Sequence, residues 1–441
     1  MSGTLEQTAE MELDGDLETP VPTTRPERVS ALVGGVALLT VFFVTQFLGL
    51  IPALAGFQIA KLSVLAVAIM FIASRERLTS RVRILSVPQV RYIIGILILA
   101  FATVPFAVWP SESLRFLLEV FLKNVIFVYF LVQAVRSDRD SRVIAGALIA
   151  GCCALVIAML TGVGPLVTYK EEPRVSVGDS YDPNDMALLF VTAIPFAFFM
   201  LKSSRPLTRL FLLGSILLML VGIVKGGSRG GFVGLLVIGA MIMLRGSRHA
   251  RKYTLITVVV GAAIFAFVAP PSYWDRIGTI WNYEKDYNLK AEGGRLQIWR
   301  TGLGMIAARP LTGVGIAGFP TAHVQFSESK LEVSPHNTLV QITAELGVGG
   351  LILISLIILA NFRTVRQVRR RAREDLRYAG MMWLASAVEV SFIGFLVSAF
   401  FLTHAYSAIF CFQVGIAAVL FVRYRSMAAA EVRQEGEVEY A

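Results

Sequence analysis

The sequence has little charge. Only 16% of its 441 residues are Asp, Glu, Lys or Arg, against about 25% in ordinary soluble domains. Hydrophobic residues make up 55%, and they stand largely in continuous runs of about 20 residues, the length that an α-helix needs to cross a bilayer. A β-barrel would show short segments that alternate apolar and polar residues. The composition therefore excludes a soluble globule and predicts an all-α integral membrane protein.

Cysteine is scarce, with three residues in the chain, and each of them lies inside an apolar run: Cys152, Cys153 and Cys411. None has the spacing to a histidine that metal ligands show. We expect all three to be small buried hydrophobic side chains, and we expect neither a metal site nor a cofactor.

Basic residues are absent from the N-terminus. The first 24 residues contain no Lys or Arg and include six acids. A cleavable signal peptide has a positively charged start, so this segment is not one. We interpret residues 1–30 as a disordered cytoplasmic tail.

Apolar segments fill most of the remaining chain. We expect about twelve transmembrane helices within one polytopic domain, residues 31–424, followed by a cytoplasmic tail, residues 425–441. The predicted spans lie near 31–55, 57–74, 92–109, 116–135, 143–162, 183–201, 207–224, 230–244, 253–270, 337–360, 380–402 and 406–421.

Lys and Arg give the chain a formal net charge of +10 and stand at the ends of apolar segments, as in Arg369-Arg370-Arg371. The positive-inside rule explains this placement, so we expect membrane lipids and no nucleic acid as a partner. Both termini are then cytoplasmic, and residues 271–336 form one long external loop. Within it, Arg295–Ala308 is predicted as an amphipathic helix with one apolar face, made of Leu296, Ile298, Trp299, Leu303 and Ile306.

Two external segments combine glycine with arginine. Arg229 lies in Gly226-Gly227-Ser228-Arg229-Gly230-Gly231, and Arg295 follows Gly293-Gly294, with Arg300 five residues later. Glycine allows a ligand to approach the backbone, and a guanidinium binds phosphate through two hydrogen bonds. These segments are consistent with a clamp for a diphosphate. The alternatives are a plain glycine-rich turn and a surface helix with solvated charges.

A third external segment, Ser334-Pro335-His336-Asn337, stands directly before a predicted span. With Ser334 as the helix N-cap and Pro335 as the first helical residue, His336 would lie in the first turn, at the mouth of an external cavity. A histidine at a helix start can equally be structural. In the same span, Glu345 is an acid that is costly to place within a membrane, which indicates a purpose.

A further acidic segment, Asp182-Pro183-Asn184-Asp185, opens the span near 183–201. It fits a capping box, with Asp182 at the N-cap and Asp185 three residues later. The alternative is contact with an acceptor sugar or support of other site residues.

The order of these motifs resembles the O-antigen ligase and polysaccharide polymerase superfamily. The resemblance covers residues 180–360 and consists of Gly-Ser-Arg-Gly-Gly, then Gly-Arg…Trp with Pro-Leu-Thr-Gly-Val-Gly, then Pro-His-Asn-Thr-Leu with Glu-Leu-Gly. It implies a helical glycosyltransferase of the GT-C type that requires no metal. The implied donor is a glycan linked to undecaprenyl diphosphate.

The resemblance also implies roles for individual residues. Arg229 and Arg295 would hold the diphosphate, with Arg300 as a third candidate, and His336 would activate the acceptor hydroxyl. The remaining candidates, for support of these residues or for contact with the acceptor, are Asp182, Asp185, Asn337 and Glu345.

The predicted reaction transfers the glycan to a hydroxyl of a glycan or lipid-glycan acceptor, at the periplasmic face of a bacterial inner membrane. A lipid diphosphate is a good leaving group once its charge is neutralised, and a neutral histidine can take the hydroxyl proton. Nearby arginines would favour that neutral form. A single inverting displacement is the simplest mechanism.

Three alternatives to an O-antigen ligase stay open at this point. A polymerase of O-antigen or exopolysaccharide repeat units would use the same donor and the same clamp. A secondary transporter of the bicarbonate-carrier kind fits less well, because the two halves of the sequence are not similar and the polar motifs are external. A non-catalytic scaffold would leave the three motifs without an explanation.

Overall fold

The computed structural model describes residues 30–46, 59–73, 83–163, 166–168, 175–177, 181–245, 294–328 and 331–439, with the single positions 255, 274 and 278. The predicted N-terminal tail, apart from its last residue, lies outside this part of the chain. So do nearly all of the predicted span 253–270 and residues 279–293 of the predicted external loop. The regular secondary structure of the described residues is helical, as predicted, apart from one short hairpin in which β1 (Leu166–Thr168) pairs antiparallel with β2 (Val175–Val177).

Helices follow one another along the described chain in this order, with η marking 3-10 and π-helices: α2 Ala31–Leu39, η1 Thr40–Val44, α3 Ile59–Ala73, η5 Ile84–Ser86, α4 Pro88–Thr103, η6 Val104–Phe106, α5 Pro110–Phe116, η7 Leu117–Phe121, α6 Leu122–Ala134, α7 Asp138–Thr161, α8 Pro183–Met200, η8 Leu201–Ser203, α9 Pro206–Gly226, α10 Arg229–Arg245, α14 Arg295–Ala308, α15 Phe319–Phe326, α16 Thr338–Glu374, η10 Leu376–Met381, α17 Met382–Ala399 and α18 Ala408–Glu439.

Eight helical segments are long and apolar enough to cross a membrane, and each overlaps a predicted span: Pro88–Phe106, Pro110–Ala134, Asp138–Thr161, Pro183–Ser203, Pro206–Gly226, Thr338–Glu374, Leu376–Ala399 and Ala408–Val432. Three shorter apolar helices overlap three more predicted spans: Ala31–Val44, Leu62–Ala73 and Arg229–Leu244. Eleven of the predicted spans thus overlap a helix of the described residues, and the twelfth, 253–270, lies almost wholly outside them.

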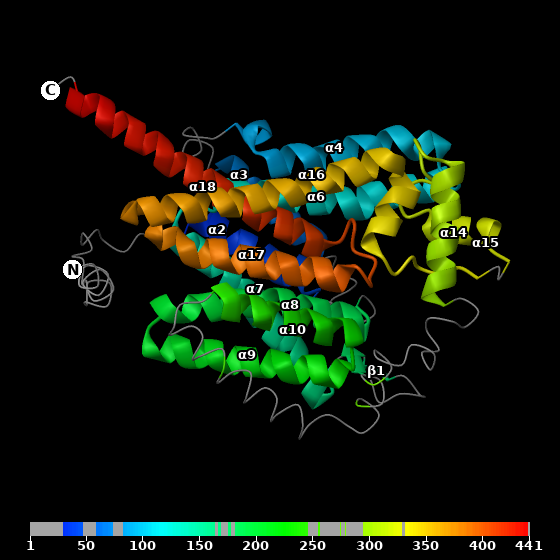
Figure 1. Cartoon of the computed structure of the whole chain (residues 1–441), viewed down its shortest axis with the longest axis horizontal. Coiled ribbons are helices and arrows are strands. Elements are labelled where there is room, and N and C mark those ends of the chain that lie inside the picture. The colour runs from blue at the N-terminus through cyan, green and yellow to red at the C-terminus, as the bar shows by residue number, and fades with distance from the viewer. Residues whose placement is uncertain are drawn as a thin grey trace, which may run out of the picture. The chain divides into compact units, whose positions relative to one another are not determined.

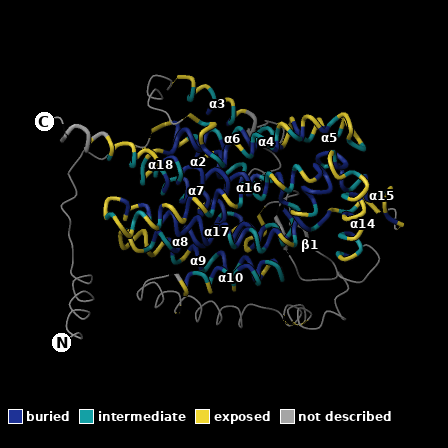
Figure 2. The backbone as a smooth tube through the Cα atoms, turned by 45° about the horizontal axis from the view of Figure 1, so that its top comes forward, coloured by how far each residue is buried: buried dark blue, intermediate teal, exposed yellow. Residues whose placement is uncertain are grey.

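Helix α8 packs against α7, α9, α10 and α17 (Figures 1 and 2). Small residues let these helices approach closely. A Cβ added at Gly231 of α10 would meet Ala187 at 2.5 Å, and one added at Gly394 of α17 would meet Val191 at 2.9 Å. Small residues at helix contacts are typical of membrane bundles, where close packing rather than water exclusion holds the helices together. The three cysteines are buried, as predicted.

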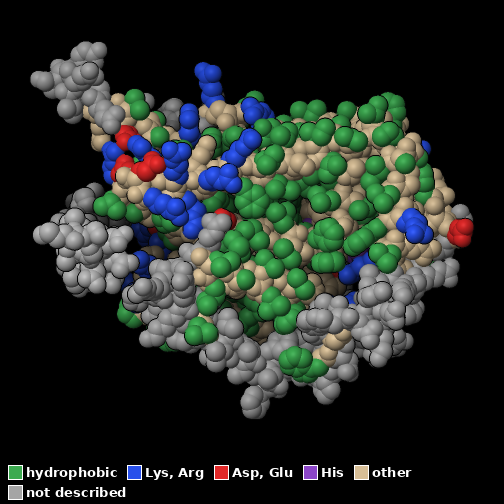
Figure 3. Space-filling model, in the orientation of Figure 1, with side chains coloured by type: hydrophobic (Ala, Val, Ile, Leu, Met, Phe, Trp, Pro, Cys, Tyr) green, Lys and Arg blue, Asp and Glu red, His purple; other side chains and the backbone are tan. Residues whose placement is uncertain are grey.

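The outer surface of the bundle is apolar along the helices. Exposed side chains include Leu65 and Ile69 on α3 and Leu207 and Leu210 on α9. Figure 3 shows hydrophobic side chains over the middle of one face and Lys and Arg gathered toward one end. Such a large exposed apolar surface is suited to lipid and not to water.

The basic end contains the C-terminal turns of α16 and the continuation of α18. Glu431 accepts hydrogen bonds from Arg371 at 2.7 Å, Arg377 at 2.6 Å and the Tyr378 hydroxyl at 3.0 Å. These contacts hold α18 against the turn that follows α16. The residues predicted as a C-terminal tail are therefore helical as far as Glu439.

Candidate active site

The segment around His336 does not begin its helix as predicted. Helix α16 begins at Thr338, and its N-cap is Asn337, whose Oδ1 accepts from the backbone N–H groups of Leu339 at 2.9 Å and Val340 at 3.0 Å. The prediction of Ser334 as the cap is wrong. The helix cannot start at Pro335, because His336 has a φ of +44°, which is not helical.

Other elements hold both sides of the His336 residue. Its N–H donates to Thr403 Oγ1 at 3.1 Å, and Trp299 Nε1 of α14 donates to the carbonyl of Pro335 at 3.1 Å. A non-glycine residue with left-handed backbone costs of the order of 1–3 kcal/mol and persists only where its surroundings enforce it. Such strain gathers at functional sites, so His336 is a candidate on its backbone alone.

The acidic segment before α8 forms the predicted capping box. Asp182 Oδ1 accepts from the N–H groups of Asn184 at 2.6 Å and Asp185 at 2.9 Å, and Asp185 Oδ2 accepts from Asp182 N at 3.2 Å. Asp185 has a second task, since its Oδ1 lies 3.0 Å from Nε2 of the buried His404. The sequence offered no signal for His404 except its place in a short turn between two spans.

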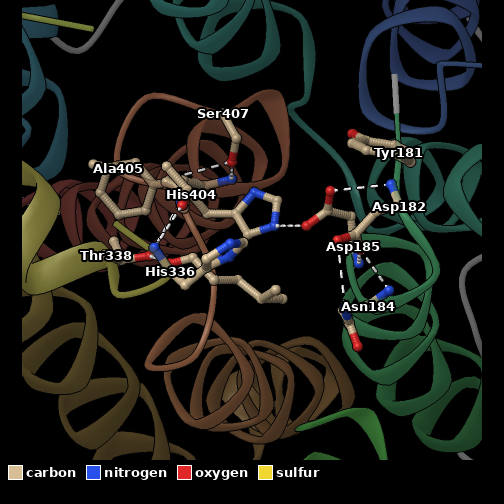
Figure 4. A network of polar contacts seen from close by, with 12 residues as sticks. Tyr181, Asp182, Asn184, Asp185, His336, Thr338, His404, Ala405 and Ser407 are labelled. Carbon is tan, nitrogen blue, oxygen red and sulfur yellow. Dashed lines mark hydrogen bonds and ion pairs between the residues drawn. The ribbon is translucent and has the colours of Figure 1, made fainter. Parts of the chain in front are cut away.

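Figure 4 shows His336 beside His404 and across from Asp182 and Asp185. Burial lowers the pKa of His336, and the positive charge of Arg295 lowers it further. Asp182 and Asp185 act in the opposite direction, and the net shift is downward. The imidazole is thus kept in its neutral form, which can accept a proton.

The two predicted clamp arginines each begin a helix. Arg295 opens α14 after Gly294, and Arg229 opens α10 after Ser228, whose Oγ accepts from Gly231 N at 3.1 Å. The backbone N–H groups at a helix N-terminus favour an anion. Both helix starts therefore suit a phosphate.

Phe401, which sequence reasoning missed, lies between these two helix starts. The Arg295 guanidinium is 5.9 Å from the centroid of the Phe401 ring. A Cβ added at Gly230, beside Arg229, would lie 4.0 Å from Cβ and Cδ2 of Phe401. Its neighbour Phe400 packs edge-on against Trp299, with ring centroids 5.7 Å apart. The turn after α17 thus places aromatic rings among both arginine segments and His336.

Arg300 does not join this group. It is exposed and lies five residues after Arg295, which is about 140° around the helix. The predicted apolar face of α14 is also narrower than expected. Ile298 and Met305 are buried, whereas Leu296 and Leu303 are exposed.

Glu345 is buried beneath the turn made by residues 310–318. Its Oε1 accepts from Phe319 N at 3.3 Å, and Oε2 has no hydrogen-bond partner within the described part of the chain. Burial and the Glu345 charge raise the pKa of Tyr406. Glu345 thus faces α15 and Tyr406, and no described contact joins it to His336.

The turn made by residues 310–318 is hydrogen-bonded to α16 at the point where that helix is interrupted. Gly347 has a φ of +68°, and Gly313 in the turn has a φ of +64°. Val314 N donates to Ala344 O at 2.9 Å, and Val348 N donates to Pro310 O at 2.8 Å. The Pro-Leu-Thr-Gly-Val-Gly and Glu-Leu-Gly motifs therefore meet as a structural joint, which fixes α14 relative to α16.

A cavity of about 520 Å³ adjoins the site. Its wall includes Asp185, His404 and Thr403 but neither His336 nor the two arginines. The remaining lining comes from η1, α5, η7, α6, α16, the 403–408 segment and two residues outside the helices, Gln46 and Tyr181. Its other members are Phe42, Phe43, Phe116, Glu119, Val120, Lys123, Asn124, Gln341, Tyr406, Ser407 and Ala408.

Comparison with known families agrees with the motifs. The O-antigen ligase family model matches residues 214–355, a segment that includes Arg229, Arg295, Arg300, His336 and Glu345. No curated protein matches the chain. This match over residues 214–355 supports the resemblance of the chain to the O-antigen ligase and polysaccharide polymerase superfamily.

Proposed function

We propose that this protein transfers a glycan from undecaprenyl diphosphate to an acceptor hydroxyl, as an O-antigen ligase of the GT-C type. One observation carries the proposal: Arg295, which begins α14, and His336, which directly precedes the N-cap of α16, lie close enough for the arginine charge to lower the pKa of the histidine. A diphosphate at Arg295 would therefore place its sugar near a neutral base. No cofactor takes part in this scheme.

The proposed chemistry is one displacement. The acceptor oxygen forms a bond to the anomeric carbon while the bond from that carbon to the diphosphate oxygen breaks, which inverts the configuration. His336 takes the hydroxyl proton, and the leaving diphosphate carries away the bonding electron pair. Arg295 and Arg229 stabilise the growing charge on the diphosphate through guanidinium hydrogen bonds and the two helix N-termini.

Two other predicted residues hold parts of the site in position. Asn337 caps α16 directly after His336, and Asp185 anchors His404. Arg300 is exposed on another side of α14, so we give it no role in the clamp.

We also propose the membrane orientation. By the positive-inside rule, the arginines at the C-terminal end of α16 support a cytoplasmic location for that end of the bundle. His336 then faces the periplasm of a bacterial inner membrane, with both termini in the cytoplasm. A thiol placed at the exposed Ser334 should react with an impermeant maleimide in intact spheroplasts, whereas one at the exposed Arg370 should react only after lysis. The reverse pattern would overturn the orientation.

Transfer itself is tested in liposomes. We expect the purified protein to move a glycan from an undecaprenyl-diphosphate-linked donor to a lipid A-core acceptor, without nucleotide sugar and with chelator present. Chain growth on the donor glycan without transfer to lipid A-core would identify a polymerase. Solute uptake with no glycan transfer in either assay would favour a transporter and contradict the proposal.

A further inference from the structure

The cavity beside the site differs from the arginine segments in its charge. Its acidic wall residues are Glu119 and Asp185, and its basic wall residues are Lys123 and His404. Two carboxylates and one ammonium repel a diphosphate more than they attract it. The cavity is therefore unsuited to the charged part of the donor.

The remaining wall suits a sugar. Amides and hydroxyls from Asn124, Gln341 and Ser407 can both donate and accept hydrogen bonds, as sugar hydroxyls require. Aromatic rings from Phe42 and Phe116 offer flat surfaces for the C–H face of a sugar ring. The volume of about 520 Å³ lies within the roughly 300–1,000 Å³ of small-molecule sites.

The wall is also built in an uncommon way. Two π-helical segments border it, η1 (Thr40–Val44) and η7 (Leu117–Phe121). A π-helical turn is rare, because its hydrogen bonding is less favourable than that of an α-helix, and it occurs frequently at functional sites. Here η1 contributes Phe42 and Phe43, and η7 contributes Glu119 and Val120.

Hydrogen bonds connect the wall to the candidate base. Thr403 lines the cavity and accepts from His336 N at 3.1 Å. The next residue, His404, lines the cavity and bonds Asp185, and Ala405 N donates to Gln341 Oε1 at 3.0 Å. A group bound in the cavity would therefore lie against Thr403, which contacts the His336 backbone, and against Asp185, whose charge acts on His336.

We propose that this cavity binds the acceptor sugar, while the arginine segments bind the donor diphosphate. The inference rests on the proposed function, since it divides one reaction between two subsites. The attacking hydroxyl would approach His336 from the cavity, and the anomeric carbon would approach from the side of Arg295. Glu119 and Val120 are exposed, so the cavity opens at η7.

A bulky side chain at this opening tests the division. Val120→Trp should narrow the cavity, and Leu118→Trp is the matched control, because Leu118 is exposed on the same π-helical segment and does not line the cavity. Transfer is measured with lipid-linked glycan and glycolipid acceptor extracted from the membranes of the source bacterium, each varied in turn. We expect Val120→Trp to raise the KM for acceptor at least tenfold and to leave the KM for donor within twofold. Leu118→Trp should leave both values within twofold of the unmodified protein.

Two results would overturn the inference: an unchanged acceptor KM in Val120→Trp, or a donor KM that rises as much as the acceptor KM. Absence of transfer by the unmodified protein would instead refute the proposed function. The thermal midpoint of each variant in detergent checks folding, and Val120→Phe replaces Val120→Trp if the larger side chain prevents folding.

Discussion

Two cavities of nearly equal size, about 520 and 500 Å³, differ in what their walls can bind. The first lies beside His336 and presents amides, hydroxyls, aromatic rings and the Asp185–His404 pair. The second lies at the basic end and is lined by four arginines and two glutamates, together with Phe362: Arg366, Arg369, Arg370, Arg373, Glu374 and Glu389. Volume alone therefore does not identify a site.

The charges of the second cavity are partly neutralised within the protein. Arg369 pairs with the buried Glu389, and Arg370 lies 3.0 Å from Glu374. At the other end of the bundle, Arg295 lies over the ring of Phe401 at a helix start. The contrast suggests that arginine acts in structure and orientation at one end and in ligand binding at the other.

At the cavity beside His336, the substitution His336→Ala should have the largest effect on turnover. Loss of a general base typically lowers a rate by about 10²–10⁴-fold, so we expect turnover to fall by that factor. Affinity for the lipid diphosphate donor should stay within about threefold, because the base acts on the acceptor. Turnover and donor binding are measured separately on the purified protein. An active His336→Ala variant would remove the proposed base.

Arg295→Lys and Arg229→Lys should weaken donor binding, because an ammonium keeps the charge and loses the two-pronged geometry of the guanidinium. A charge-assisted contact is worth about 1.5–3 kcal/mol, so the donor Kd should rise roughly 10- to 150-fold. Arg369→Lys is the matched control from the second cavity and should leave the donor Kd unchanged. If Arg369→Lys raised the donor Kd as much as Arg295→Lys and Arg229→Lys do, the distinction between the two cavities would be wrong.

Gly313→Ala should destabilise the joint that fixes α14 beside α16. An added Cβ would lie 2.3 Å from the carbonyl of Glu345, and the φ of +64° disfavours any side chain. We expect a lower thermal midpoint together with reduced transfer. Gly304→Ala in α14 is the control, because nothing lies within 4 Å of its added Cβ, and helix propensity should stabilise it by about 0.5–1 kcal/mol. If the Gly313→Ala variant were as stable as the Gly304→Ala variant, the proposed role of Gly313 in holding the turn against α16 would be wrong.

The pH profile should give the smallest effect. His336 must be neutral to accept a proton, and its lowered pKa means that it gains a proton only below the ordinary histidine range near 6.5. The acid limb of turnover should therefore lie below pH 6.5, with activity lost as the pH falls through the lowered pKa. Asp185→Asn removes a charge that raises this pKa, so the limb should move to lower pH. A shift to higher pH would contradict the electrostatic contact between Asp185 and His336.

Several local features were predictable because short-range chemistry decides them. The capping box of Asp182 and Asp185, the start of α14 at Arg295 and the burial of the cysteines all follow from neighbouring residues or from apolar runs. The prediction of Ser334 as the N-cap was wrong, because His336 has a left-handed backbone conformation. That conformation depends on hydrogen bonds from His336 to Thr403 and from Trp299 to Pro335, and both partners are distant in the sequence.

The amino-acid sequence alone was enough to predict a helical membrane protein, since the length, the apolar composition and the ends of the hydrophobic runs are properties of the chain. Motif order indicated the family whose model matches residues 214–355. Which motif residues meet depends on the tertiary fold. In the folded chain His404 bonds Asp185, and Phe401 lies between the two arginine segments. Arg300 is exposed, and the turn that contains Gly313 is hydrogen-bonded to α16 near Gly347. These outcomes depend on helix rotation and packing, which a local sequence does not encode.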